Sequence, residues 1–583
     1  MVSLKRFGLV AVVTMGMATG LAQVQSSTAP GSAQKLAADN TAAQAPATNV
    51  PQVVDRLIQR EKQLVQSMKQ YHPMVETYLQ SVKPDAELGT VPTGDQYFLA
   101  RLDLSNGYDE RFYTDTDTGD GAGWRSIFGK MNPLAKRKYV NFGIIPVGFT
   151  AMIFPDARGL DRQSYYFQLV RREFLGDVRC LVLDVVPKNP KETGRFLGRI
   201  WVEDQDYNIV RFNGSFTNPP AGRMYFHMDS WRQNVAGERW LPSVVYTEEA
   251  GMSSTGSQKQ TEQFKAQTRI WGYDLRQSGR QEEFTQMLVD QPDSEVKDKS
   301  DSEQDFSPIM SLRQWQREAE DNVVERLERS GLLAPASPVD KVLQTVVNNL
   351  VITNDLNLQQ DVRCRVLLTS PLETFTVGHT IVVSRGLIDV LPDEASLAMV
   401  LSHELAHIAA GDQLDSKYAF SDRMWFADED TYHQLRLQRT AQEEQAADAR
   451  ALELLKKSPY ADKLASAGLF LRQMKQRSGE LPNLLKARLG DSLVQNGAVR
   501  MAALMESAPE LQMRKVDQIA ALPLGGRIKL NPWNDRVELM RTKSVPLQSA
   551  REKMPFEIAP SIPHLTRVTD TNSATLKAAA GGN

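Results

Sequence analysis

Residues 401–408 read Leu-Ser-His-Glu-Leu-Ala-His-Ile and lie within an apolar run that extends from 393 to 412. The run is apolar almost all the way round a helical wheel, which is typical of a buried helix. Asp393 and Glu394 place negative charge in the expected first turn, where it suits the helix dipole, and Gly411 is a natural stop. The stretch therefore predicts a helix in the core of a globular domain.

Two histidines and a glutamate in this stretch follow the pattern H-E-x-x-H. Positions i and i+4 lie on one helical face, so His403 and His407 can direct their imidazoles at one metal ion. Glu404 lies about 100° further round the helix and can reach a metal-bound water, whose pKa zinc lowers towards neutrality. The chain has only 7 His in 583 residues, so a chance match is rare. Two histidines satisfied inside a core helix are the alternative.

A catalytic zinc needs a third protein ligand and one position left open for water. A second helical stretch, from about 435 to 457, contains Glu444 and Asp448, which again lie at positions i and i+4 and place two carboxylates on one face. The small alanines around them would let this helix approach the first closely. His433, between the two segments, is the main rival as third ligand, although a lone histidine in a polar stretch is more typical of an exposed side chain.

The two segments resemble a family of zinc endopeptidases that includes the CAAX prenyl protease, HtpX and BepA. The resemblance rests on Asp-Glu-Ala leading into H-E-x-x-H at 393–407 and on Glu-x-x-Ala-Asp at 444–448, and it covers roughly residues 338–540. It implies a mainly helical, zincin-type metalloprotease domain with a small β-sheet.

Roles for individual residues follow from this resemblance by position. The Glu of E-x-x-A-D is the family's third zinc ligand, which implies that Glu444 completes a site for one Zn²⁺ per chain with His403 and His407. The Asp of that motif orients a ligand and is sometimes described as a proton donor, which implies a catalytic role for Asp448. Glu404 would be the catalytic base that activates water for peptide hydrolysis.

The strand expected before the zinc helix also fits the resemblance. Residues 375–388 are similar to the family's segment along which substrate is thought to add as an extra strand. We therefore expect Thr380 and Val382 to bind substrate through their backbone. His379, which precedes this strand, is a candidate to approach the substrate, although it has no motif of its own.

The end of the domain departs from the family pattern. Many members carry His-Pro followed by Arg, whereas the matching stretch 530–537 has Asn531 in place of the His and keeps Arg536. Arg536 is a candidate to stabilise transition-state charge, with a structural ion pair as the alternative.

Composition sets broader limits. A chain of 583 residues with 41% hydrophobic content can form two or three domains with cores, and a net charge of -3 gives no indication of nucleic acid as a partner. Cys180 and Cys364 fit no metal motif and both lie in strand-like runs. We expect two buried thiols rather than a disulfide, although an exporting compartment would permit one.

The N-terminus has the pattern of a secretory signal. Lys5 and Arg6 precede an apolar stretch at 7–18 that is too short to span a bilayer, and a small-x-small site ends the segment 1–22. We expect an exported protein, periplasmic or secreted and soluble after cleavage, with an uncleaved anchor as the alternative. Residues 23–49 are rich in Ala, Gln, Ser, Thr and Pro and predict a disordered linker.

The chain then predicts a multidomain α+β protein. An apolar period typical of a helix runs from 50 to about 82, and alternating strands between 95 and 277 predict an antiparallel β-sheet, so 50–277 form a β-rich N-terminal domain with a leading helix. One hairpin loosely resembles periplasmic lipoprotein-carrier folds. The remaining expected segments are a charged linker, the zinc peptidase domain and an extended tail: 278–308, 309–545 and 546–583.

The function predicted from the sequence is that of an exported zinc endopeptidase in envelope protein quality control. Its partners would be polypeptide substrates, chiefly unfolded or misassembled envelope proteins. The alternative is a binding or assembly factor for lipids or outer-membrane proteins with a gated or weakly active zinc site. In that case the N-terminal domain would contact lipid or the membrane periphery.

Overall fold

The computed structural model describes residues 49–112, 149–273, 308–411, 431–512, 528–539 and 565, apart from short gaps within these ranges. The expected signal at 1–22 lies outside the described residues. So do the linker at 23–49 except its last residue, the charged linker at 278–308 except its last residue, and the tail at 546–583 except Leu565.

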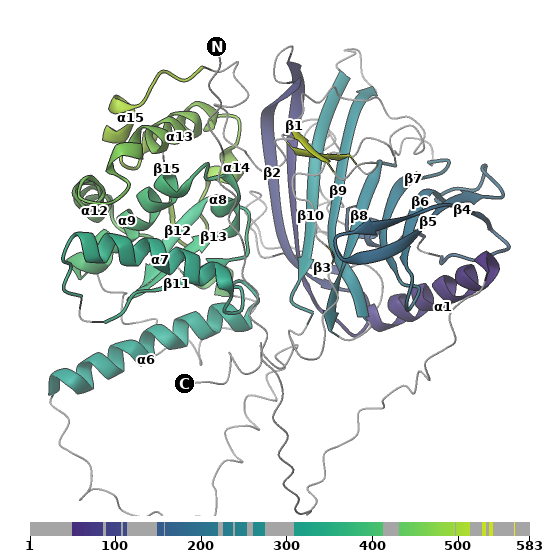
Figure 1. Cartoon of the computed structure of the whole chain (residues 1–583), viewed down its shortest axis with the longest axis horizontal. Helices are drawn as coiled ribbons and strands as arrows, with labels where there is room; N and C mark the ends of the chain where they lie inside the picture. Colours follow the sequence, from purple (N-terminus) through teal and green to yellow (C-terminus); the bar gives the residue numbers. More distant parts are fainter. Residues whose placement is uncertain are drawn as a thin grey trace, which may run out of the picture. The chain divides into compact units, whose positions relative to one another are not determined.

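The N-terminal half is built on a ten-stranded sheet in the order β3-β2-β1-β10-β9-β8-β7-β6-β5-β4 (Figure 1). Its strands are β1 (Met74–Asp85), β2 (Gly89–Asp103), β3 (Asp109–Phe112), β4 (Tyr165–Leu175), β5 (Val178–Pro187), β6 (Phe196–Glu203), β7 (Ile209–Phe216), β8 (Met228–Ala236), β9 (Arg239–Ser253) and β10 (Thr261–Trp271). Every neighbouring pair is antiparallel, which confirms the predicted antiparallel sheet.

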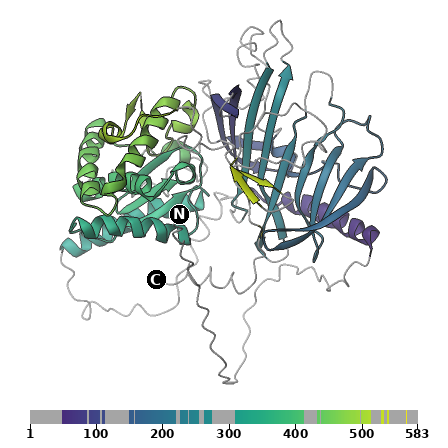
Figure 2. The same cartoon turned by 45° about the horizontal axis from the view of Figure 1, so that its top comes forward.

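Helix α1 (Val50–Met68) packs against the sheet at β7 and β8 (Figure 2). The Asn49 side chain accepts the backbone N–H of Gln52 at 3.0 Å and caps its first turn. Farther along, the carboxylate of Glu61 accepts two hydrogen bonds of 2.7 Å from the Arg232 guanidinium, and both side chains are almost fully buried. This ion pair fixes the helix to the sheet.

The predicted helix over 50–82 is wrong in its second part. The chain leaves the helix after Met68 and forms β1 from Met74, pairing with β2 on one side and β10 on the other. Most of β1 is buried on both faces. A strand of that kind has an almost continuous apolar pattern that local periodicity cannot distinguish from a helix.

The second half places helices around a four-stranded sheet in the order β11-β13-β12-β14. Its elements are α6 (Pro308–Arg329), α7 (Pro338–Thr353), β11 (Arg363–Leu367), β12 (Glu373–Val377), β13 (Thr380–Ser384), α8 (Arg385–Val390), α9 (Glu394–Ala410), α11 (Thr431–Gln434), α12 (Ala441–Lys456), α13 (Leu464–Arg477), α14 (Pro482–Leu485), β14 (Asp491–Ser492), β15 (Val494–Gln495), β16 (Ala498–Val499) and α15 (Ala503–Ser507). The α+β class is confirmed.

Helix α9 is the centre of this half, as the sequence predicts. Asp393 caps it by accepting the Ser396 backbone N–H at 2.8 Å, and Gly411 ends it in the left-handed region at φ 73. The helix packs against α7, α12 and α13. Its residues are buried from Ala398 to Ile408, which places the H-E-x-x-H motif inside the core.

The strand expected to offer a free edge is an interior strand. β13 pairs in parallel with β11 and antiparallel with β12, so the backbones of Thr380 and Val382 already have partners on both sides. The prediction that these two residues bind substrate along an edge is therefore wrong. On β12, the backbone beyond Thr374 has an open edge on the side of β14, because β14 pairs with Glu373 and Thr374 alone among the described residues.

Cys180 and Cys364 are both buried, as expected. Within the described residues, the helices are too short or too polar to cross a membrane.

The stretch matched to the family's His-Pro motif forms β17 (Ile528–Asn531) and β18 (Arg536–Leu539), and the side chains of Asn531 and Arg536 lie outside the described residues.

Candidate metal centre

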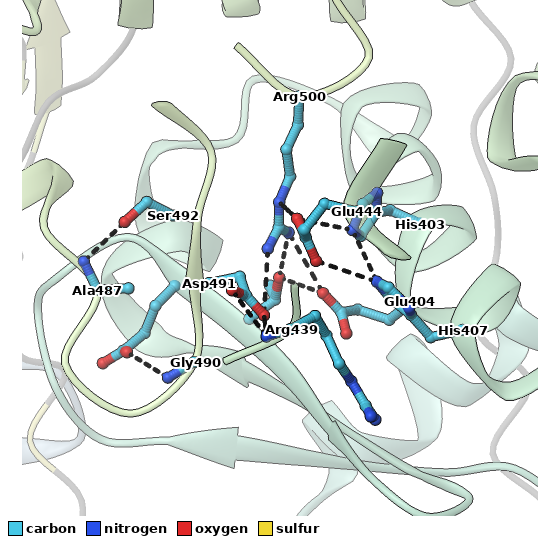
Figure 3. A network of polar contacts seen from close by, with 12 residues as sticks. His403, Glu404, His407, Arg439, Glu444, Ala487, Gly490, Asp491, Ser492 and Arg500 are labelled. Carbon is cyan, nitrogen blue, oxygen red and sulfur yellow. Dashed lines mark hydrogen bonds and ion pairs between the residues drawn. The ribbon is translucent and has the colours of Figure 1, made fainter. Parts of the chain in front are cut away.

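Three side chains from two helices converge on one point (Figure 3). His403 and His407 project from α9, and Glu444 projects from the first turn of α12. The Nε2 atom of His407 lies 3.2 Å from the Nε2 atom of His403 and 3.1 Å from Oε1 of Glu444. The Nε2 atom of His403 lies 3.4 Å from Oε2 of Glu444.

This arrangement fits a zinc ion. Two imidazole nitrogens and a carboxylate form a donor set found in catalytic zinc sites, and metal–ligand distances of about 2.1 Å in a tetrahedral site place neighbouring donor atoms about 3.4 Å apart. The separations between the three ligand atoms match that spacing. Two imidazole nitrogens directed at each other also favour a cation between them.

Helix α12 brings Glu444 to the site because its first turn is capped and the side chains on its contact face are small. A capping box joins Thr440 and Glu443 and fixes the start of the helix at Ala441. Ala447 and Ala451 are buried, and α12 packs closely on α9. Small side chains allow the two helices to approach each other, which brings Glu444 to the histidines.

Asp448 holds one ligand in place. Its Oδ1 atom accepts a hydrogen bond from Nδ1 of His403 at 2.9 Å, which turns Nε2 of that imidazole towards the cluster. Its Oδ2 atom accepts the backbone N–H of Met501 at 2.7 Å. Met501 has a φ of 52, a left-handed conformation that costs a non-glycine residue roughly 1–3 kcal/mol. The carboxylate thus fixes both a histidine and a strained turn.

Glu404 lies beside the cluster and is almost completely buried. Its Oε1 atom accepts a hydrogen bond of 2.5 Å from the Thr374 hydroxyl on β12. Nη1 of Arg500 lies 3.3 Å from the same oxygen. Both donors hold the carboxylate in a single orientation.

Arg500 lies in this cluster of side chains, and sequence reasoning did not identify it. It follows β16, its side chain is 7% exposed, and its Nε atom donates to Oε2 of Glu444 at 3.0 Å. Its Nη1 atom also donates to Thr374 Oγ1 at 2.9 Å. Its Nη2 atom is buried with no hydrogen-bond partner among the described residues, and the nearest carboxylate oxygen, on Asp491, is 3.9 Å away. A buried guanidinium therefore offers a free N–H donor beside Glu404.

The electrostatics of the site shift the pKa values of two carboxyl groups in opposite directions. Burial opposes ionisation of Glu444, but hydrogen bonds from His403 and His407 and the charge of Arg500 outweigh it, so the pKa of Glu444 lies well below its usual range. Burial raises the pKa of Asp491 to about 7, against the attraction of Arg500 and with the repulsion of Glu444 and Glu404.

The other candidates lie elsewhere. His379 places its Nδ1 atom 3.1 Å from a carboxylate oxygen of Glu320 on α6, which indicates a structural contact. Thr380 accepts a hydrogen bond from Arg363 at 3.1 Å and is buried, as is Val382. The side chain of His433, on α11, lies outside the described residues.

A comparison with protein families assigns the segment that carries the motif. Residues 339–426 match Peptidase family M48. The match covers α9 with His403, Glu404 and His407, while Glu444 and Asp448 lie beyond its end. Peptidase family M48 comprises zinc metallopeptidases, so the M48 segment indicates a metalloprotease, a hydrolase that acts on polypeptides. The three-residue cluster is compatible with the metal that this family uses. A comparison with curated proteins gives no match to the chain.

Proposed function

We propose that the protein is a zinc-dependent endopeptidase of the M48 type, close to the group that includes the CAAX prenyl protease, HtpX and BepA. The observation that carries the proposal is the cluster of His403, His407 and Glu444 beside the buried carboxylate of Glu404. The bound Zn²⁺ would polarise the scissile carbonyl and make a bound water acidic enough to lose a proton near neutral pH.

Each side chain then has a defined task. Glu404 takes the proton from the attacking water and delivers it to the leaving amine, while Thr374 keeps its carboxylate oriented. Asp448 holds the His403 imidazole in the orientation that directs Nε2 at the metal. The free Nη2 donor of Arg500 stabilises the negative charge that develops on the substrate carbonyl oxygen.

Substrate would bind as an extended strand along the open edge of β12. That strand carries Thr374 beside Glu404, so a polypeptide paired with its edge would pass close to the base. Backbone hydrogen bonds would supply the affinity with little demand on sequence. This mode of binding suits unfolded polypeptides.

A role in envelope protein quality control follows if the chain is exported. The signal-like segment 1–22 supports export to the periplasm or the exterior, and unfolded or misassembled envelope proteins are then the natural substrates. Fusion of residues 1–22 to a reporter that folds only after export tests localisation. A reporter that stays inactive would contradict it.

Metal content tests the proposed ligand set. Glu444→Gln should remove most of the zinc from the purified protein, because a neutral amide binds zinc far more weakly than a carboxylate. Glu453→Gln is the matched control, since Glu453 lies on the same helix with an exposed side chain. Equal zinc content in both variants would contradict the assignment and make His433 the next candidate.

A second candidate function is contact of the N-terminal sheet with lipid or a membrane surface. The observation that favours it lies on β4, where the aromatic side chains of Tyr166 and Phe174 are 62% and 57% exposed. Cosedimentation with phosphatidylglycerol vesicles tests it. The double variant Tyr166→Ser, Phe174→Ser should abolish the cosedimentation, and unchanged binding by that variant would contradict this role for β4.

A further inference from the structure

Arg500 reaches the candidate metal centre from the end of a short hairpin. The strands β15 and β16 pair antiparallel, and the backbone N–H of Arg500, which follows β16, donates to the carbonyl of Leu493 at 3.0 Å. Leu493 directly follows β14, which pairs with Glu373 and Thr374 on β12. The position of Arg500 therefore depends on how firmly the chain before the hairpin is held against β12.

Glu373 holds that part of the chain. Its side chain is buried, and its Oε2 atom accepts the backbone N–H groups of three consecutive residues, at 2.8 Å from Arg488, 2.9 Å from Leu489 and 3.1 Å from Gly490. Burial raises the pKa of Glu373, while the three N–H donors and the charge of Arg488 act in the opposite direction. We call residues 487–490 the anchor loop, because Glu373 binds it to β12.

Other contacts hold the anchor loop on its remaining sides. The N–H of Ala487 donates to the Ser492 hydroxyl at 2.8 Å, and the carbonyl of Leu489 accepts the N–H of Leu437 at 2.9 Å. Gly490 passes so close to β12 that a Cβ atom at this position would overlap the backbone of that strand. The anchor loop thus joins β12 to the segment that leads into α12.

The residue after the anchor loop faces Arg500. The Oδ2 atom of Asp491 lies 3.9 Å from Nη2 of Arg500 and accepts the backbone N–H of Arg439 at 3.2 Å (Figure 3). Arg500 in turn donates to the Thr374 hydroxyl at 2.9 Å. The guanidinium therefore lies between a carboxylate that the anchor loop places and the side chain that directly follows Glu373 on β12.

We propose that Glu373 is a positioning residue for Arg500. By binding the anchor loop to β12, it sets the place of Asp491 and of the hairpin, and hence the direction in which Nη2 of Arg500 points. That this direction matters for peptide hydrolysis rests on the proposed function; the binding of the loop does not. A misplacement of about 1 Å can lower the rate of an enzyme about 10²-fold, so loss of Glu373 should lower activity while zinc stays bound.

Two substitutions of similar size test the acceptor oxygen. The Oε1 atom of Glu373 is buried without a hydrogen-bond partner among the described residues, so Glu373→Gln can keep its oxygen on the three N–H groups, whereas Glu373→Met removes the acceptor. Per zinc-bound chain, Glu373→Met should lower kcat/KM for α-casein about 10- to 100-fold, and Glu373→Gln should stay within about three-fold of the parent. Equal losses in both variants would overturn the proposal.

The matched control is a glutamate that is also buried in this half of the chain. Glu320, on α6, is 6% exposed and contacts His379. Glu320→Met should lower the thermal midpoint through the same loss of a buried carboxylate, and it should leave kcat/KM per zinc-bound chain unchanged.

A double-mutant cycle shows whether Glu373 acts through Arg500. In the Arg500→Met background, Glu373→Met should change kcat/KM by less than about two-fold, because the group that Glu373 positions is already absent. An undiminished loss in that background would overturn the proposal, since a purely structural residue lowers activity whether or not Arg500 is present.

Gly490→Ala displaces the anchor loop while Glu373 stays intact. Its Cβ should push the loop away from β12 and reproduce the loss seen in Glu373→Met, whereas Gly479→Ala, where a Cβ meets open space, should not. If Glu373→Met does not fold, Gly490→Ala takes its place in the cycle. Unfolding of both variants would show that the loop is only a structural part of the core and would overturn the proposal.

Amide hydrogen exchange tests the binding of the loop without any cleavage. The amides of residues 488–490 should exchange at least about ten-fold faster in Glu373→Met than in the parent, and Glu373→Gln should retain the protection. Equal exchange in Glu373→Met and the parent would overturn the proposal. A parent protein that cleaves no polypeptide would instead contradict the peptidase function, so the two failures are distinct.

Discussion

Arg500 contacts both Glu444 and Glu404 at the candidate metal centre, and its Nη2 atom has no hydrogen-bond partner among the described residues. In the proposed mechanism this N–H donates to the reacting carbonyl. Arg500→Met should lower kcat/KM by about 10²–10³-fold, the effect of removing one donor to a developing oxyanion, while the zinc content stays near that of the parent. Arg450→Met, at an exposed position on α12, is the control and should leave kcat/KM unchanged. Loss of zinc in parallel with activity would mean that Arg500 acts through Glu444 instead.

The titration of Asp491 makes the free energy of unfolding depend on pH. Burial raises its pKa from 3.8 to about 7 in the folded protein. Between these values the folded state binds more protons than the unfolded state, so stability falls as pH rises towards 7. In zinc-free protein, Asp491→Asn should therefore raise the thermal midpoint more at pH 8 than at pH 5. Asp462→Asn, at an exposed site, should change neither, and an equal gain at both pH values would contradict this account.

At the residue scale, the sequence predicts what local spacing determines. His403, Glu404 and His407 are fixed by the i, i+1 and i+4 positions of one helix, and the structure brings all three to the same place. Glu444 and Asp448 were candidates from their own i, i+4 spacing, and the family resemblance implied their roles; in the structure Glu444 contacts His407 and Asp448 contacts His403. Arg500 reaches the site through tertiary packing, and no local sequence pattern around it indicates that placement.

At the scale of elements, α1 depends on one buried ion pair. Glu61→Gln would leave the Arg232 guanidinium buried without a charged partner, which costs about 3–5 kcal/mol. Calorimetry should show a lower thermal midpoint for the unfolding of the sheet. Asp55, on the same helix, forms an exposed ion pair with Arg162, which lies outside the helix. Asp55→Asn should therefore lower the free energy of unfolding by about 1 kcal/mol or less. Similar losses in both variants would show that α1 is not fixed by Glu61.

Elements were predictable where their pattern is self-contained. Helix α9 has a cap, a continuous apolar body and a glycine stop, and its predicted bounds agree with the structure. The strands β1 and β13 were mistaken for a helix and for an edge. Whether a strand is interior depends on partners elsewhere in the chain, such as β11 beside β13, and an apolar run does not identify those partners.

At the scale of the molecule, the metal should stabilise the helical half, because its three proposed ligands join α9 to α12 inside one core. Free zinc at about 1,000 times its dissociation constant stabilises a folded domain by about 4 kcal/mol. Chelation should lower the calorimetric midpoint of that half and leave the sheet transition in place. Glu444→Gln should lack this zinc-dependent shift. A shift of equal size in that variant would place the metal elsewhere.

The α+β organisation follows from the change of apolar period along the chain, whereas the packing of Leu565 on the sheet does not. Residues 546–583 have no clear period and predict an extended tail. One leucine buried among tryptophans far away in sequence is a tertiary contact, and composition carries no signal for it.

Zinc content and peptide cleavage, measured side by side on the parent protein and its Glu404→Gln variant, test the central claim most directly. The parent should contain one zinc per chain and cleave α-casein in a reaction that a chelator abolishes and added zinc restores. Glu404→Gln should keep its zinc and lose cleavage by several orders of magnitude, because the metal ligands remain while the base is gone. Full cleavage by Glu404→Gln, or a parent protein without zinc, would contradict the account.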